Sequence, residues 1–225
     1  MLKNTEIIGF VPARAGSERI KSKNVRTLNG HPLMAYAIAS AVQSGVFTRV
    51  ICSTDSEEYA KIARHYGAEV PFLRPPEFAT SESPDIEWIL YTLDRLGYSE
   101  GNFSILRPTS PFRGVETSQR AWKQFQDVTE ADSLRAVSKV REHPGKMWVL
   151  ADDRRTMDTL LDQTHLDVTW HAGQYKSLPE VYVQNSSLEM ARIPAVLETK
   201  TREGRVLSPF LTEPMEGFSL DYEDE

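Results

Sequence analysis

The stretch that decides the fold lies near the start of the chain, where residues 7–24 read IIGFVPARAGSERIKSKN. Its first part, 7–11, is a short and continuous apolar run that stops at Pro12. Such a run, bounded by a breaker, is typical of a strand that is buried on both faces of a sheet. A polar and basic segment follows at once. The sequence therefore predicts a buried strand that leads directly into a polar loop.

Strand and helix patterns alternate further along the chain. Apolar residues at helical spacing follow Pro32 and end before Gly45, where a helix C-cap belongs. A third helix is expected to start at Ser83, a capping residue followed by Pro84. The full set of expected elements comprises helices at 32–45, 57–65, 83–96 and 115–125 and strands at 7–11, 49–53, 69–72, 102–106, 134–140 and 182–185. This alternation predicts an α/β fold with a Rossmann-like, mainly parallel sheet and helices on both faces.

The length of 225 residues suits one domain over residues 1–225. After Val140 the alternation breaks, and the stretch 141–180 contains scattered charges with two prolines and two glycines. We interpret 141–180 as an inserted arm that can serve as an oligomer contact. In a sheet of this kind, ligands bind beyond the C-terminal ends of the strands.

The composition excludes several classes of protein. The net charge of −6 argues against nucleic acid as a partner. The apolar runs are too short to span a bilayer or to act as a signal peptide, so no membrane association is expected. The single cysteine, Cys52, cannot form an internal disulfide, which fits the reducing cytoplasm.

The charge is unevenly distributed along the chain. Residues 13–26 carry five cations and one acid, Glu18, and thus a net charge of +4. Residues 213–225 carry six acids and no cation, a net charge of −6. The first segment can attract an anion. The second can attract a cation or form a solvated tail.

The loop after the first strand has the residue types of a phosphate-binding loop. Its small residues allow backbone N–H groups to approach an anion closely. They are Ala13, Ala15, Gly16 and Ser17. Arg14, Lys21 and Lys23 can neutralise phosphate charges. The loop matches neither the Walker A pattern nor GxGxxG, and a solvated basic loop remains the alternative.

The loop resembles the N-terminal signature of the acylneuraminate cytidylyltransferases, roughly Pro-Ala-Arg-x-Gly-Ser-Lys-Gly/Arg-Ile-x-x-Lys-Asn, with Glu18 where Lys is common. Further matches follow in order as STD at 53–55, LRPPEF at 73–78 and RPTSPFR at 107–113. The resemblance covers residues 6–130 closely. It implies a cytidylyltransferase that activates a nonulosonic, sialic-type acid with CTP, giving CMP-sugar and pyrophosphate. It also implies Mg²⁺ as cofactor and a homodimer with 141–180 in the interface.

The resemblance also implies roles for individual residues. The implied nucleotide-binding residues are Ala13, Arg14, Gly16, Ser17, Lys23, Asn24, Arg74 and Ser83. Arg14 and Lys23 are the implied catalytic residues, since they contact the phosphates. The implied sugar-binding residues are Arg107, Thr109, Ser110, Tyr175 and Asn185. Asp221 is the implied Mg²⁺ ligand, with Ser219 where relatives carry a further Asp.

Some positions depart from the family pattern and leave alternatives open. Arg107 stands where many sialic acid enzymes have Gln, and it can pair with the sugar carboxylate or with other ring substituents. Arg113 is expected either in the pocket region or at the surface, near a helix start. The alternatives are a Kdo-type cytidylyltransferase, a sugar-1-phosphate nucleotidyltransferase, or a catalytically inactive homologue that binds CTP or a nucleotide sugar.

Overall fold

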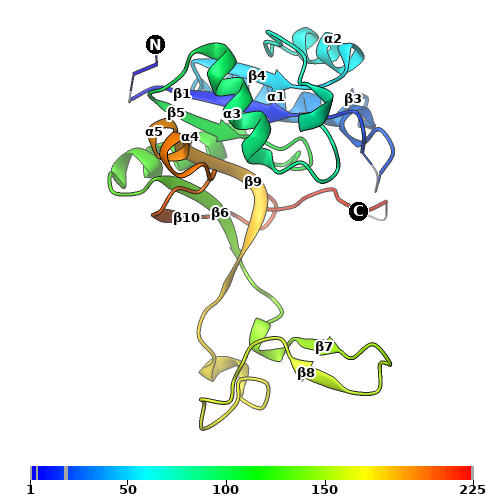
Figure 1. Cartoon of the computed structure of the whole chain (residues 1–225), viewed down its shortest axis with the longest axis vertical. Helices are drawn as coiled ribbons and strands as arrows, with labels where there is room; N and C mark the ends of the chain where they lie inside the picture. The colour runs from blue at the N-terminus through cyan, green and yellow to red at the C-terminus, as the bar shows by residue number, and fades with distance from the viewer. Residues whose placement is uncertain (1, 4, 18–19, 224–225) are drawn as a thin grey trace. The chain divides into compact units, whose positions relative to one another are not determined.

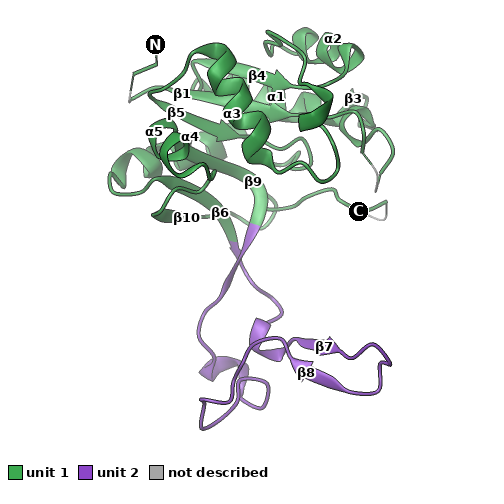
Figure 2. Cartoon of the chain, viewed as in Figure 1, with its two compact units in different colours: residues 1–137, 185–225 green, residues 138–184 purple. Residues whose placement is uncertain are grey.

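The computed structural model describes residues 2–3, 5–17 and 20–223 (Figure 1). Glu18, where the signature departs from the family, lies outside the described residues, as does Arg19. The chain forms two compact units (Figure 2). Unit 1 comprises residues 1–137 and 185–225, and unit 2 comprises residues 138–184.

The sheet of unit 1 has six strands in the order β10-β6-β9-β5-β1-β4. These strands are β1 (Ile7–Pro12), β4 (Arg49–Ser53), β5 (Asn102–Ile105), β6 (Ser133–Lys139), β9 (Tyr182–Arg192) and β10 (Leu207–Leu211). β1 pairs in parallel with β4 and β5, and β10 pairs in parallel with β6. β9 is antiparallel to β5. A small hairpin of β2 (Thr27–Leu28) and β3 (His31–Pro32) follows the basic loop.

Five helices accompany the sheet. They are α1 (Leu33–Ser44), α2 (Glu57–His65), α3 (Asp85–Leu96), α4 (Val115–Asp127) and α5 (Ile193–Thr199). α1 ends at Gly45, whose φ of 66° lies in the left-handed region that glycine adopts without strain. α2 starts after Ser56, whose hydroxyl accepts a hydrogen bond from the Tyr59 N–H. The predicted helices at 32–45, 57–65 and 115–125 are therefore confirmed.

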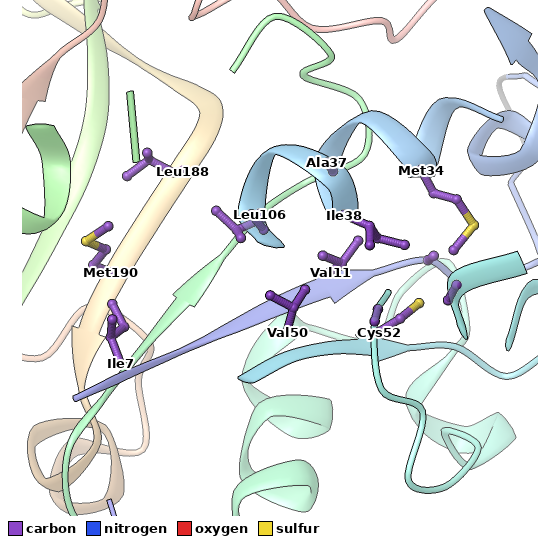
Figure 3. Packing of buried hydrophobic residues seen from close by; sticks show 14 of the residues in the cluster. Ile7, Val11, Met34, Ala37, Ile38, Val50, Cys52, Leu106, Leu188 and Met190 are labelled. Atoms are coloured by element: carbon purple, nitrogen blue, oxygen red, sulfur yellow. The ribbon is translucent and has the colours of Figure 1, made fainter. Parts of the chain in front are cut away.

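The two faces of the sheet carry separate hydrophobic cores. Along β1, Ile7 and Val11 pack in the core shared with α1, α2 and α4. Ile8 and Phe10 pack in the core shared with α3 and α5. Figure 3 shows Ile38 of α1 directed toward β1 and β4. Because successive strand side chains point to opposite faces, this alternation requires helices on both faces, as predicted.

Two local predictions differ from the structure, and some elements were not predicted. The expected strand at 69–72 is wrong: only one bridge forms, between Glu69 and Ile51, because Pro71 has no N–H to continue the ladder. Ser83 does not cap α3; the N-cap is Pro84, and the Ser83 hydroxyl donates to the Glu77 carbonyl instead. β10 and α5, and the length of β9 beyond residue 185, were not anticipated.

Unit 2 contains one antiparallel hairpin, β7 (Trp148–Leu150) and β8 (Met157–Thr159). In its interior, Gly145 lies close to Trp170. A Cβ atom added at Gly145 would lie only 2.7 Å from the Trp170 Cβ. Lys146 Nζ donates to the carbonyls of His171 and Gly173, at 3.0 and 2.8 Å, and so holds the facing loop.

Among the helices in the described ranges, none combines the length and the apolar character needed to cross a bilayer.

Candidate active site

A cavity of about 330 Å³ opens where β1 and β5 end. Its lining residues are Pro12, Arg14, Ser17, Ile20, Lys23, Asn24, Arg74, Ser81, Asp85, Arg107, Pro108 and Thr109. Seven of these were predicted from the sequence as site residues, and these seven come from three separate segments. The cavity lies at the strand ends where open α/β sheets bind their ligands.

Two side chains fix the backbone of the basic loop. Asn24 is buried, and its Nδ2 donates to the Arg14 carbonyl at 3.0 Å. Asp55, from the segment after β4, accepts a hydrogen bond from the Ala15 N–H at 2.8 Å. These bonds hold the loop against the end of the sheet. The side chains of Arg14 and Lys23 consequently line the cavity from a fixed backbone.

Arg74 is held rigidly at the cavity wall and is only 5% exposed. Its Nε donates to Ser53 Oγ and its Nη2 to the Ser53 carbonyl, both at 3.0 Å. Its guanidinium also lies 4.7 Å from the Trp88 ring centroid, a cation–π contact. Burial lowers the pKa of Arg74 to about 10, while the nearby acid Asp85 opposes that shift. The side chain therefore remains a charged and oriented donor at neutral pH.

Arg107 belongs to an ion network at the other wall of the cavity. Its Nη2 pairs with Asp85 Oδ2 and lies 3.3 Å from Glu189 Oε1. Arg202 Nη1 contacts the same two oxygens, at 3.0 and 3.2 Å. Burial alone would raise the pKa of Asp85, but Arg107 holds it below its usual value. The guanidinium of Arg107 is thus balanced by carboxylates in the free protein.

Asp85 is a lining residue that the sequence analysis missed. Its position in the first turn of α3 gave it a local explanation, since acids favour helix N-termini. Arg107 carries a charge where many sialic acid enzymes have the neutral Gln. This charge was the signal that an acid had to lie nearby, because a partly buried cation requires a partner.

The acidic C-terminal segment meets the basic loop. Lys23 Nζ lies 2.8 Å from Asp221 Oδ1, and Arg26 Nη1 lies 2.6 Å from Glu223 Oε1. Ser219 Oγ donates to the second oxygen of Asp221 at 2.7 Å. The opposite charges of the two ends of the chain therefore pair with each other in space.

Asp221 is the residue that the family resemblance implies as a Mg²⁺ ligand. The described residues contain no group of three or more acids, histidines or cysteines able to hold a metal ion. Asp221 nevertheless places a carboxylate beside Lys23, which lines the cavity. Mg²⁺ is often held by one or two carboxylates together with substrate phosphates and water. Asp221 offers one such carboxylate, and its role as a Mg²⁺ ligand stays a prediction.

Several predicted residues lie near the cavity without lining it. Ala13 is fully buried, and its N–H donates to the Ser53 carbonyl. Gly16 is exposed in the basic loop, and Ser83 is two residues from the lining Ser81. Ser110 is buried beside Thr109. Their roles at the site stay predictions.

Two of the predicted sugar-binding residues, Asn185 and Tyr175, are not among the lining residues. Asn185 Nδ2 donates to Thr212 Oγ1 at 2.8 Å, a bond that joins the start of the unit 1 part of β9 to the segment after β10. Tyr175 belongs to unit 2, within a short 3₁₀ turn. The sugar-binding role of both stays a prediction.

Arg113 is fully buried, contrary to the surface position considered for it. Its Nη1 donates to the carbonyls of Ser187 and Arg107. Burial lowers the pKa of Arg113 to about 9. The side chain therefore fastens the loop after β5, which carries Thr109, to β9.

Comparison with known proteins gives consistent matches. The cytidylyltransferase family model matches residues 8–139. The chain is 32% identical over 217 residues to the N-acylneuraminate cytidylyltransferase of Escherichia coli O18:K1:H7, covering 96% of this chain and 49% of that protein. It is 32% identical over 208 residues to the CMP-N,N'-diacetyllegionaminic acid synthase of Legionella pneumophila, covering 91% and 86%. The chain thus spans about half of the first relative and most of the second.

A solved structure of a CMP:2-keto-3-deoxy-manno-octonic acid synthetase complexed with CTP has the same fold. Its TM-score is 0.68 at 10% identity, over 97% of this chain and 94% of that one. At such low identity the likeness concerns the fold alone. The family model and the two relatives confirm the resemblance drawn from the sequence motifs, and the chain belongs to the cytidylyltransferase family.

Proposed function

We propose that this chain transfers the cytidylyl group of CTP to a nonulosonic acid, giving a CMP-sugar and pyrophosphate. The anomeric hydroxyl oxygen of the acid forms a bond to the α-phosphorus. The bond from that phosphorus to the α,β-bridging oxygen breaks, pyrophosphate leaves, and the hydroxyl proton is released. The observation that carries the proposal is the cavity, in which Arg14 and Lys23 from one segment meet Arg74 and Arg107 from two others.

The proposal gives a role to several of the lining residues. Arg14 and Lys23 neutralise the triphosphate, and Arg74 offers its fixed donors to the acceptor atoms of cytosine. Arg107 and Thr109 contact the acid. Such phosphoryl chemistry depends mainly on positioning and on charge stabilisation, which a set of pre-oriented cations supplies. When bound beside Asp221, Mg²⁺ would supply further charge neutralisation for the phosphates.

The proposal is tested by measuring pyrophosphate release with CTP across sialic, legionaminic, pseudaminic and Kdo-type acids, with UTP and ATP beside CTP. We expect release with CTP and one of the nonulosonic acids. Release only with the Kdo-type acid would favour the Kdo alternative. Binding of CTP, seen as a raised melting temperature, without release from any acid would favour an inactive nucleotide-binding homologue.

Asp221→Asn is expected to raise the Mg²⁺ concentration needed for half-maximal release, because a carboxylate binds this hard cation better than an amide. The measurement is a Mg²⁺ titration of pyrophosphate release at saturating CTP. Glu223→Gln is the matched control, because Glu223 pairs with Arg26 at the exposed end of the same segment. An unchanged titration for Asp221→Asn would move the metal site elsewhere.

We also infer that the protein forms a homodimer through unit 2. Large apolar side chains of this unit are exposed, among them Trp148, Val149, Leu150, Met157 and Val168. Soluble monomers rarely expose large apolar patches.

We also infer a reducing, cytoplasmic location for the protein. Its single cysteine, Cys52, is a free thiol buried in β4.

Leu150→Asp is expected to shift the sedimenting species from a dimer toward a monomer, because it places a charge among apolar contacts. Sedimentation velocity at micromolar concentration is the measurement. Val42→Asp serves as control, since Val42 is a similarly exposed apolar residue in unit 1. A monomeric wild-type protein at that concentration would count against the dimer.

A further inference from the structure

The segment that carries Asp221 has little regular structure of its own and is held by contacts with other loops. After β10, the Thr212 N–H donates to the Val137 carbonyl at 3.1 Å. The Phe218 ring packs against the Phe112 ring, with centroids 5.7 Å apart. The Leu220 N–H donates to the Thr109 carbonyl at 2.8 Å. The segment 212–223 therefore runs from the end of β6, past the loop after β5, to the basic loop.

The Glu216 side chain ties this segment to α4. Its carboxylate accepts from Thr117 Oγ1 at 2.6 Å and from Arg120 Nη2, which lies 2.6 Å from both of its oxygens. It also accepts from the Glu213 N–H at 2.8 Å, which closes a local turn. The Glu216 side chain is only 15% exposed. Two residues of α4 are thus tied to the middle of the segment.

The charge of Glu216 is stabilised at this position. Burial would raise the pKa of its carboxyl group, but hydrogen bonds from Arg120 and Thr117 hold it below its usual value. The carboxylate is therefore ionised at neutral pH, where its hydrogen bonds are of the stronger, charge-assisted kind.

Thr117 connects this anchor to the active-site loop. The same hydroxyl that donates to Glu216 accepts a hydrogen bond from the Gly114 N–H at 3.2 Å. Gly114 is the N-cap of α4 and ends the loop that carries Arg107 and Thr109. One hydroxyl group thus joins the end of the sugar-side loop to the segment that presents Asp221.

We propose that Glu216 is a positioning residue, which through Thr117 and Arg120 sets the place of Asp221 beside the phosphate-binding loop. Glu216 lies five residues before Asp221 and touches neither Lys23 nor the cavity lining. Fixing a flexible segment costs conformational entropy, so the presentation of Asp221 depends on such anchors. The expected effect on Mg²⁺ use rests on the proposed function. The anchoring of the segment 212–223 by Glu216 does not depend on that function.

Two variants test the proposal, Glu216→Ala and the conservative Glu216→Gln. The matched control is Asp127→Ala, because Asp127 forms an exposed ion pair with Lys123 on the same helix, α4. The first readout is hydrogen exchange at the Leu220 amide, which reports whether the segment stays docked on Thr109. The second is the Mg²⁺ titration of pyrophosphate release, with kcat at saturating Mg²⁺ measured separately.

For Glu216→Ala we expect Leu220 exchange to be about tenfold faster and the half-saturating Mg²⁺ concentration to rise about tenfold, as when hydrogen bonds to a charged group are lost. The kcat at saturating Mg²⁺ should stay within about twofold, because metal and substrate can still order the segment. Glu216→Gln should fall between Glu216→Ala and the wild type, and Asp127→Ala should match the wild type.

Unchanged Leu220 exchange in Glu216→Ala would overturn the proposal. So would a fall in kcat with an unchanged Mg²⁺ requirement, which would indicate a general structural role. If the wild type released no pyrophosphate with any acid, the proposed function would fail, while the exchange measurement would still decide whether Glu216 anchors the segment.

Discussion

Replacing Lys23 with alanine is expected to lower kcat/KM for CTP about 100-fold or more, the loss seen when one pre-oriented donor is removed from a charge-stabilising site. Lys23 lines the cavity and is anchored at Asp221, so its ammonium group is already in place before the nucleotide binds. Without it, the charge that develops on the α-phosphoryl oxygens loses a pre-oriented cation that also balances the negative charge of Asp221. The measurement is the initial rate of pyrophosphate release as a function of CTP concentration.

Arg26→Ala is the control for this experiment. Arg26 belongs to the same basic segment and also pairs with the C-terminal segment, through Glu223, but it does not line the cavity. We expect its kcat/KM to stay within about threefold of the wild type, because exposed ion pairs contribute little. A Lys23→Ala variant with near-normal turnover would remove Lys23 from the mechanism. The double variant with Asp221→Asn would measure how far the two residues act together.

Replacing Glu189 with alanine is expected to lower the free energy of unfolding by about 3–5 kcal/mol, the usual cost of removing one partner from a buried ion pair. Glu189 lies on β9, and its side chain is 7% exposed. Its Oε2 lies 3.2 Å from Nη2 of Arg135, which is equally buried, and its other oxygen contacts Arg107 and Arg202. The substitution would leave these arginines with fewer carboxylates in a region of low solvent access.

Chemical denaturation monitored by tryptophan fluorescence gives the unfolding free energy of each variant. Glu198→Ala is the matched control, because Glu198 pairs with Arg205 at the surface, where both side chains are more than half exposed. Its expected cost is below about 1 kcal/mol. A similarly small cost for Glu189→Ala would show that the network around Arg107 contributes little to stability. Its arginines would then be better explained by ligand binding alone.

Several elements of the fold were predictable from the sequence alone. β1, α1, β4 and α2 were predicted with nearly the observed bounds, because their signals are local, such as an apolar run ended by Pro12 and helical spacing ended by Gly45. The basic loop at the cavity was predictable for the same reason, since small and basic residues directly follow a buried strand. By contrast, the run at 69–72 looked like a strand, yet Pro71 limits its pairing to one bridge.

The long-range polar contacts at and around the site had no comparable local signal. Lys23 and Asp221 are 198 positions apart, Thr117 and Glu216 are 99 apart, and Arg107 and Glu189 are 82 apart. A single sequence gives the charge of each residue but not its partner, because the partner is chosen by the order of the strands and by the path of the chain between them. The sequence by itself therefore determined those strands and helices, and the basic loop at the cavity, whose causes lie within a few residues. Only the tertiary structure decided which carboxylate balances which cation, since burial and distance arise when the strands have assembled.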